Sequence, residues 1–129
     1  MRVLRLTIVA ALSVIVTAAA ADPRFERSLR LLAPTERLEQ LCDYTAMTQI
    51  RKDKRQLRPD RAVANAMSDV QHKSDMLVAK GAAVRSRGKW YALSYTCSAD
   101  AEHLKVTSFT YKLGAEIPEG KWAGYGLWQ

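Results

Sequence analysis

The chain has 129 residues, and its 20 lysines and arginines outnumber its 13 aspartates and glutamates to give a formal net charge of +7. This length supports one domain with a single core and argues against a multidomain architecture. The mild positive charge is a weak indication of an anionic partner, because solubility alone also explains it.

The amino-terminal segment has the pattern of a secretory signal peptide. Arg2 and Arg5 precede an apolar run over residues 6–16, and small residues end the segment at a cleavage site after position 21. The apolar stretch is shorter than the roughly 18 residues that a membrane-spanning helix requires. We therefore expect a signal peptide over residues 1–21 and a single mature domain over residues 22–129. That domain would be periplasmic or secreted, with no transmembrane segment.

Two cysteines, Cys42 and Cys97, are the only ones in the chain. In an exported protein such a pair favours a disulfide. A metal site is the alternative, but it would need further ligands at close spacing. The chain offers His72 and His103, which form neither a C-x-x-C nor an H-x-x-x-H pattern. We predict a Cys42–Cys97 bond, no metal site and no cofactor.

The first half of the mature chain indicates helices. Asp22 before Pro23 is typical of a capped helix start, and a second helix is expected from Pro34. Asp43 falls on the polar side of the second helix. The apolar stripe, which follows the helical period, comprises Leu38, Leu41, Cys42, Thr45, Ala46, Gln49 and Ile50.

Residues 51–61, RKDKRQLRPDR, form a dense basic segment that Pro59 excludes from any continuing helix. Two interpretations stand: a solvated linker and a loop that contacts an anion. Residues 61–67 fit a short helix or a strand equally well, and the pattern does not decide between them. We expect residues 70–80 to be irregular.

The second half alternates with a period of two, which is typical of strands. Strands are predicted over residues 82–87, 90–97 and 106–113, with a turn at Gly88. Cys97 lies on the side with larger residues, which we expect to face the core. The glycine-rich tail predicts a last strand, on which Trp122 and Trp128 share one face.

These elements predict an α+β fold. Amino-terminal helices would pack on an antiparallel sheet of about four strands, in helix-then-meander order. One disulfide would pin the longer helix across the sheet.

The sequence contains no nucleophile elbow, phosphate-binding glycine loop or zinc-protease pattern. A Ser–His–acid triad would have to recruit His72 or His103, each of which lies in a polar stretch. We therefore do not expect an enzyme.

One patch combines cations and aromatic residues: Arg85, Arg87, Lys89 and Trp90. On a hairpin these side chains would suit an anionic or sugar-containing ligand, through charge-assisted hydrogen bonds and stacking. The alternative is an ordinary hairpin whose arginines face solvent.

Several motifs occur in an order that resembles the bacterial domain of unknown function number 930. They are RLEQLCDYTAM at residues 37–47, RPDR at 58–61, GAAVRSRGKWYALSYTC at 81–97, and VTSFTYKLGAEIP with a following tryptophan. The resemblance implies a small exported protein of alphaproteobacterial type. It supplies no catalytic residues, because the family has no established activity.

The functional hypothesis is an exported, non-enzymatic binding or interaction module that uses the basic-aromatic hairpin. Its partner would be an anionic envelope polymer or another periplasmic protein, and not nucleic acid. A cell-envelope hydrolase is the alternative. A flat basic face with an exposed Trp90 would favour the module, whereas a deep pocket with His72 or His103 beside a carboxylate would favour the hydrolase.

Overall fold

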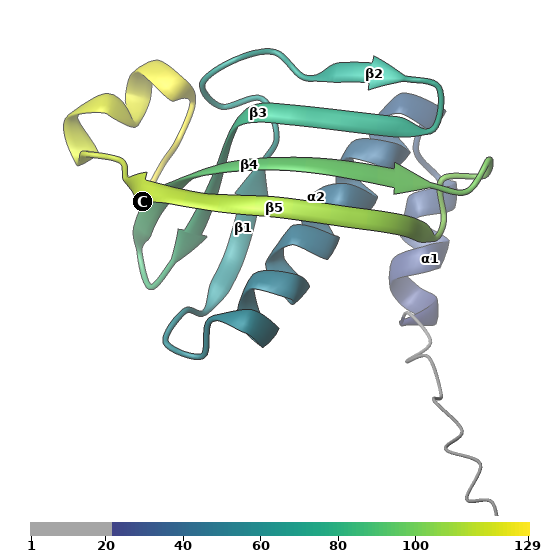
Figure 1. Cartoon of the computed structure of the whole chain (residues 1–129), viewed down its shortest axis with the longest axis horizontal. Helices are drawn as coiled ribbons and strands as arrows, with labels where there is room; N and C mark the ends of the chain where they lie inside the picture. Colours follow the sequence, from purple (N-terminus) through teal and green to yellow (C-terminus); the bar gives the residue numbers. More distant parts are fainter. Residues whose placement is uncertain (1–21) are drawn as a thin grey trace, which may run out of the picture.

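The computed structural model describes residues 22–129, so the predicted signal peptide lies outside the described residues. Within this range the fold is α+β, as predicted: two helices precede an antiparallel sheet of five strands. The sheet order is β1-β3-β4-β5, and β2 pairs with the part of β3 that β1 leaves free. Figure 1 views the sheet from the side opposite the long helix α2.

The helices begin where the capping residues predicted. Helix α1 (Pro23–Arg30) follows Asp22, whose carboxylate accepts a hydrogen bond from the Arg24 backbone N–H at 2.9 Å. Helix α2 (Pro34–Asp53) has 20 residues and begins with proline at its first turn. Neither helix has the length and apolar character that crossing a membrane requires.

Arg37 joins the two helices to the sheet. Its guanidinium donates to the carbonyl oxygens of Leu29 and Leu32, both at 3.0 Å, at the carboxyl end of α1. It also donates to the carbonyl of Glu102, in the turn between the last two strands, at 2.9 Å. Carbonyl groups at the end of a helix lack partners within it, so one cation satisfies several of them and fixes α1 in place.

The strands are longer than the sequence predicted. They are β1 (Pro59–Val63), β2 (Gln71–Lys73), β3 (Met76–Ser86), β4 (Lys89–Ala99) and β5 (Val106–Glu116). Arg87 and Gly88 connect β3 to β4 with φ angles of 52° and 74°. Two consecutive positive φ angles in a two-residue loop are the geometry that matches the right-handed twist of the flanking strands.

Two expectations need correction, and one open alternative is resolved. Residues 70–80 are not irregular, because they contain β2 and the start of β3, where the buried Leu77 and Ala79 alternate with more exposed neighbours. Of the ambiguous residues 61–67, the first three belong to strand β1. The tail is not a strand.

The tail forms two short 3-10 turns, η1 (Glu119–Lys121) and η2 (Ala123–Tyr125). Gly126 contributes to the difference, because it adopts φ 67° after the second turn, a left-handed conformation outside the extended range of a regular strand. Trp122 bonds locally instead, donating its indole N–H to the Ile117 carbonyl at 2.9 Å.

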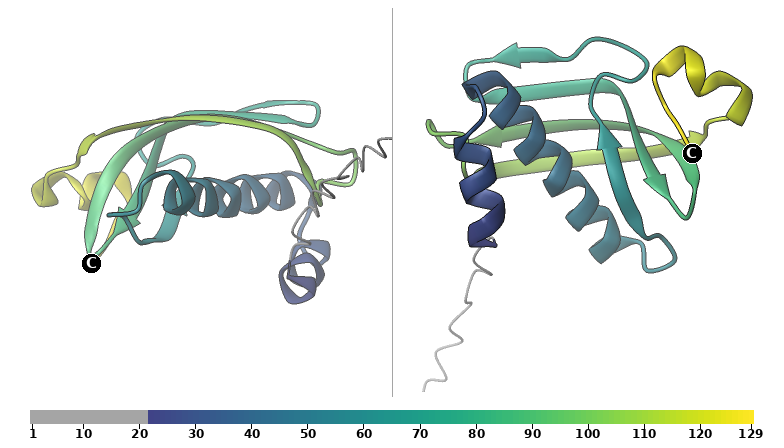
Figure 2. Two further views of the ribbon diagram at one scale, coloured as in Figure 1. Left: turned by 60° about the horizontal axis from the view of Figure 1, so that its bottom comes forward. Right: turned by 180° about the vertical axis from the view of Figure 1, so that it is seen from behind.

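The inner core lies between α2 and the concave side of the sheet, as the left view of Figure 2 shows. The Cys42–Cys97 disulfide crosses it with a Cα–Cα separation of 6.0 Å, which confirms the predicted pairing. The largest fully buried aliphatic side chains of this core are Leu29, Leu38, Ile50, Leu77, Leu93 and Val84.

A second, outer core forms where the tail packs against one end of the sheet. Its fully buried centre is Trp90, and the surrounding buried residues are Ala83, Ile117, Trp122 and Leu127. Gly81 allows a loop to approach β3 next to this core, since a Cβ there would lie 2.6 Å from the Ser68 backbone nitrogen. The Met67 N–H donates to the Gly81 carbonyl at 2.7 Å at this contact.

Candidate anion-binding site at the cationic end

The pairing of β1 with β3 brings two basic segments together that are far apart in the sequence. Pro59 pairs with Ser86, and the Arg58 backbone N–H donates to the Ser86 hydroxyl at 2.8 Å. The connection after α2 therefore lies beside the β3–β4 turn, and the right view of Figure 2 shows both at the same end of the molecule. We call this region the cationic end.

The cations of this region are all solvent-exposed, and they come from the end of α2, the following connection, β1 and the β3–β4 turn. Of these cations, only Lys89 has a carboxylate of the described chain within ion-pair distance, Glu116 at 3.9 Å. The cationic end comprises Arg51, Lys52, Lys54, Arg55, Arg58, Arg61, Arg87 and Lys89.

Three of these arginines are held in place by neutral acceptors, including Arg61, which donates to the Asp60 carbonyl at 2.7 Å. Arg51 donates to the Pro59 carbonyl, and the Arg58 guanidinium donates to the carbonyls of Arg55 and Leu57 at 2.6 and 2.9 Å. A carbonyl orders a guanidinium without cancelling its charge. The remaining N–H groups of each planar guanidinium can therefore bind a carboxylate or phosphate.

The acids near this end offset only part of its charge. Asp53 accepts hydrogen bonds from the Tyr111 hydroxyl at 2.8 Å and from the Gln49 amide, which lower the pKa of this carboxyl. Desolvation, with the neighbouring Asp53, raises the pKa of Tyr111 to about 12. Asp60 is fully engaged by Arg85. The cationic end therefore keeps a surplus of positive charge.

Arg85 was predicted to contact a ligand, but the structure gives it an internal role. Its guanidinium donates to both carboxylate oxygens of Asp60, at 3.0 and 2.9 Å. It also lies 5.7 Å from the ring centroid of Trp90 and 5.8 Å from that of Trp128. Hydrogen bonding to Arg85 lowers the pKa of Asp60, and the same bond raises the pKa of Arg85.

Trp90 is not exposed, contrary to the condition that we set for a binding face. Its side chain is fully buried, and its indole N–H donates to the Trp128 carbonyl at 2.7 Å. The alternation of residues in β4 correctly predicted that Trp90 faces away from the inner core. It did not indicate that the tail covers this side chain. Of the four predicted ligand residues, Arg87 and Lys89 remain at the surface, and they lie beside the basic segment 51–61, a neighbour that no local sequence pattern indicated.

Each histidine lies beside a carboxylate, as the hydrolase alternative requires, but neither has the hydroxyl or thiol neighbour of a catalytic triad among the described residues. His72 pairs with Glu39 at 2.9 Å, and His103 lies between Asp75 at 2.9 Å and the Pro34 carbonyl at 2.8 Å. Among the described residues, no hydroxyl or thiol donates to either imidazole. The ion pairs and the Pro34 contact connect α2 to β2 and to the turn after β4.

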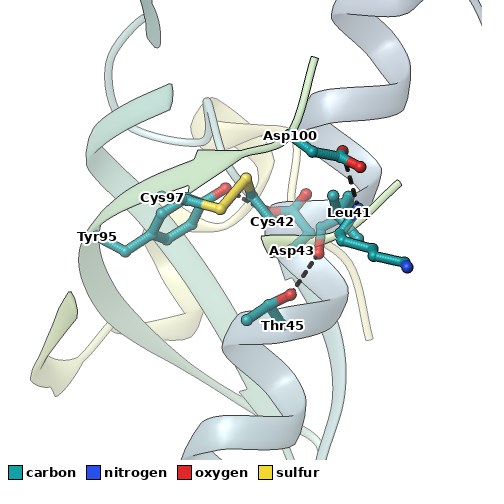
Figure 3. The surroundings of a disulfide bond; sticks show 8 residues. Leu41, Cys42, Asp43, Thr45, Tyr95, Cys97 and Asp100 are labelled. Atoms are coloured by element: carbon teal, nitrogen blue, oxygen red, sulfur yellow. Dashed lines mark hydrogen bonds between the residues drawn. A yellow bond between two sulfur atoms is a disulfide. The ribbon is translucent and has the colours of Figure 1, made fainter. Parts of the chain in front are cut away.

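A buried acid beside the disulfide was missed, because the helical pattern put Asp43 on the polar side. Its side chain is buried, and it accepts a hydrogen bond from the Tyr95 hydroxyl at 2.7 Å (Figure 3). Desolvation raises the pKa of Asp43 to about 7, and it also raises the pKa of Tyr95. The only sequence feature that could have indicated its burial is its position directly after Cys42, which was expected on the buried face of the helix.

A family model described as Domain of Unknown Function (DUF930) matches residues 29–127, which is most of the chain. The chain belongs to the DUF930 family. The resemblance of the sequence motifs to this family is therefore confirmed, and the match includes α2, the disulfide, the cationic end and the tail. No curated protein and no solved structure matches this DUF930 protein.

Proposed function

We propose that this DUF930 protein is an exported binding module that holds an anionic polymer of the cell envelope at its cationic end. The observation that carries the proposal is the joining of two basic segments by the β1–β3 pairing, with their cations exposed and mostly without carboxylate partners. The signal-peptide pattern of the first 21 residues supports the export.

The favourable interaction of cations with the carboxyl end of α2 explains only part of this positive charge. Cations in the last turn of a helix, such as Arg51 and Lys52, are favoured by the helix dipole. Lys54, Arg55 and Arg87 lie outside the helix and repel their neighbours. Like charges that lie close together cost stability unless a partner neutralises them, which supports a role in binding.

A polymer fits better than a lipid surface. Of the exposed large apolar side chains of the described chain, Leu31 and Tyr44 lie away from the cationic end, and Trp128, beside Arg85, is the one near it. Peripheral membrane binding normally combines charge with inserted apolar side chains. A soluble polyanion requires only the charge.

The test compares Lys54→Gln/Arg55→Gln/Arg87→Gln with Arg24→Gln/Arg27→Gln/Lys105→Gln. Both triple variants lose three exposed cations that make no ion pair, but the second set lies on α1 and in the β4–β5 turn. Titration calorimetry with inorganic polyphosphate should show about tenfold weaker binding for the first variant and much less change for the second. The difference should fade as salt rises above physiological concentration.

Equal losses in both variants would contradict the proposal, because they would indicate net charge instead of a site. Binding to phosphatidylglycerol vesicles with none to polyphosphate would replace the polymer by a membrane surface. Shortening of the polymer during incubation would favour the hydrolase instead.

A further inference from the structure

The outward side of the sheet has an open polar region apart from the cationic end. Strand alternation directs Leu77, Leu93 and Cys97 to the inner core, so the residues between them face outward. The register aligns Val78 with Thr96 and Thr96 with Thr110. Figure 1 faces this side, and no helix covers it.

A shallow hollow of about 310 Å³ lies across three strands on this side. Its outward-facing lining comprises Val78, Lys80, Ser94, Thr96, Thr110 and Lys112. The tail does not cover it, since the outer core buries the other end of the same face, around Ala83 and Trp90. Its volume is at the lower end of the range of about 300–1,000 Å³ for small-molecule sites.

The polar groups of the hollow have no partners within the described chain. Neither lysine forms an ion pair, and the side chains of Ser94, Thr96 and Thr110 make no hydrogen bond to protein atoms. No carboxylate lines the hollow. Two ammonium groups and three hydroxyls are therefore available on one rigid surface.

The two lysines flank a central hydroxyl. Ser94 pairs with Lys112 on β5, and Lys80 lies on β3 where the register with β4 shifts. Neighbouring strands are about 4.8 Å apart, so the two lysine backbones stand roughly 10 Å from each other across Ser94. An anion between them would be attracted by both. Because β4 is paired on both sides, little ordering would accompany binding.

We propose that this hollow binds a sugar unit that carries a carboxylate. The lysines would hold the carboxylate, and the hydroxyls of Ser94, Thr96 and Thr110 would exchange hydrogen bonds with the hydroxyls of the sugar ring. An acidic sugar matches both features of the lining, its unpaired cations and its row of groups that donate as well as accept. This site is separate from the cationic end and does not depend on the proposed function.

The experiment is a titration of ¹⁵N-labelled protein, residues 22–129, with tri-galacturonate and with neutral galactotriose. Tri-galacturonate should shift the amide signals of Ser94, Thr96 and Thr110. The variant Lys80→Gln/Lys112→Gln should bind about tenfold more weakly, at an unchanged melting temperature. The matched control is Arg24→Gln/Arg27→Gln, which removes two exposed cations of α1 that form no ion pair within the described chain and should leave the affinity unchanged.

Three results would overturn the inference. The first is an equal response to neutral galactotriose, which would remove the role of the lysines. The second is a set of shifts confined to the cationic end and abolished by Lys54→Gln/Arg87→Gln. The third is no shift for any signal at 10 mM ligand, roughly the weakest affinity that such a site should have.

Discussion

The two sides of the sheet are buried by different means. On the concave side, one 20-residue helix contacts β1, β3, β4 and β5, and a disulfide ties its middle to β4 near the end of that strand. On the outward side, a glycine-containing tail of two short turns covers one tryptophan at one end. The inner core is large, apolar and covalently joined. The outer core is small and depends on directional polar contacts.

This difference shows how a small domain compensates for a limited core. A domain of about 100 residues has little apolar surface to bury, so each side needs an additional constraint. The inner side uses a covalent bond. The outer side uses Arg85, which contacts Asp60, Trp90 and Trp128 together.

Removing the disulfide should have the largest effect. The bond joins residues 55 apart in the sequence, and the chain-entropy model gives roughly 4 kcal/mol for a loop of this size. We expect Cys42→Ser/Cys97→Ser to lower the free energy of unfolding by about that amount, as measured by urea denaturation with circular dichroism. The parent protein, purified from an oxidising compartment, should contain no free thiol. Two titratable thiols in native parent protein would contradict this prediction.

Asp43 should give the inner core a pH dependence. Its pKa is about 7 in the folded protein, against 3.8 for an unperturbed aspartate. Between these values the folded state binds a proton that the unfolded state does not, so stability falls as pH rises from about 4 to 7 and then levels off. Asp43→Asn should therefore be more stable than the parent at pH 8, by roughly 4 kcal/mol at most, and similar to it at pH 4.

Thermal unfolding at several pH values between 4 and 8 measures this effect. Asp53→Asn is the control, because the pKa of Asp53 is lowered, so its contribution should stay constant over this pH range. The decisive quantity is the difference in melting temperature between the parent protein and Asp43→Asn. If this difference did not change between pH 5 and 8, Asp43 would be ionised throughout that range.

Arg85 and Arg87 lie two residues apart, but their substitution should affect stability differently. The difference tests whether Arg85 anchors the tail at the outer core. Arg85→Gln removes the paired bonds to Asp60 and the contacts with both tryptophans, so it should cost about 1–2 kcal/mol. Arg87→Gln alters an exposed turn residue without an ion pair and should change stability by less than about 0.5 kcal/mol. Urea denaturation of the two variants measures the difference. Equal effects would mean that Arg85 does not anchor the tail.

The sequence predicted what depends on local pattern. The helix starts at Pro23 and Pro34, the face of Cys42 and the alternation of β4 all follow from spacing and capping, and the structure confirms them. The α+β class and the disulfide follow from these elements.

What the sequence could not predict depends on contacts between distant residues. Nothing local indicates that Pro59 pairs with Ser86, although this pairing creates the cationic end. Nothing local indicates that the tail buries Trp90, because its glycines allow several backbone conformations. Asp43 was misplaced for a related reason: its burial is compensated by Tyr95, a partner 52 residues away.

The placement of the tryptophans has a consequence for spectroscopy. The chain has three, and all of them belong to the outer core or its rim: Trp90 and Trp122 are buried there, and Trp128 packs edge-on against Trp90. Their emission therefore reports on the tail, while the helical signal in the far ultraviolet reports on the inner core. Tryptophan fluorescence and circular dichroism, followed on the same sample, would therefore show whether the outer core or the inner core unfolds first.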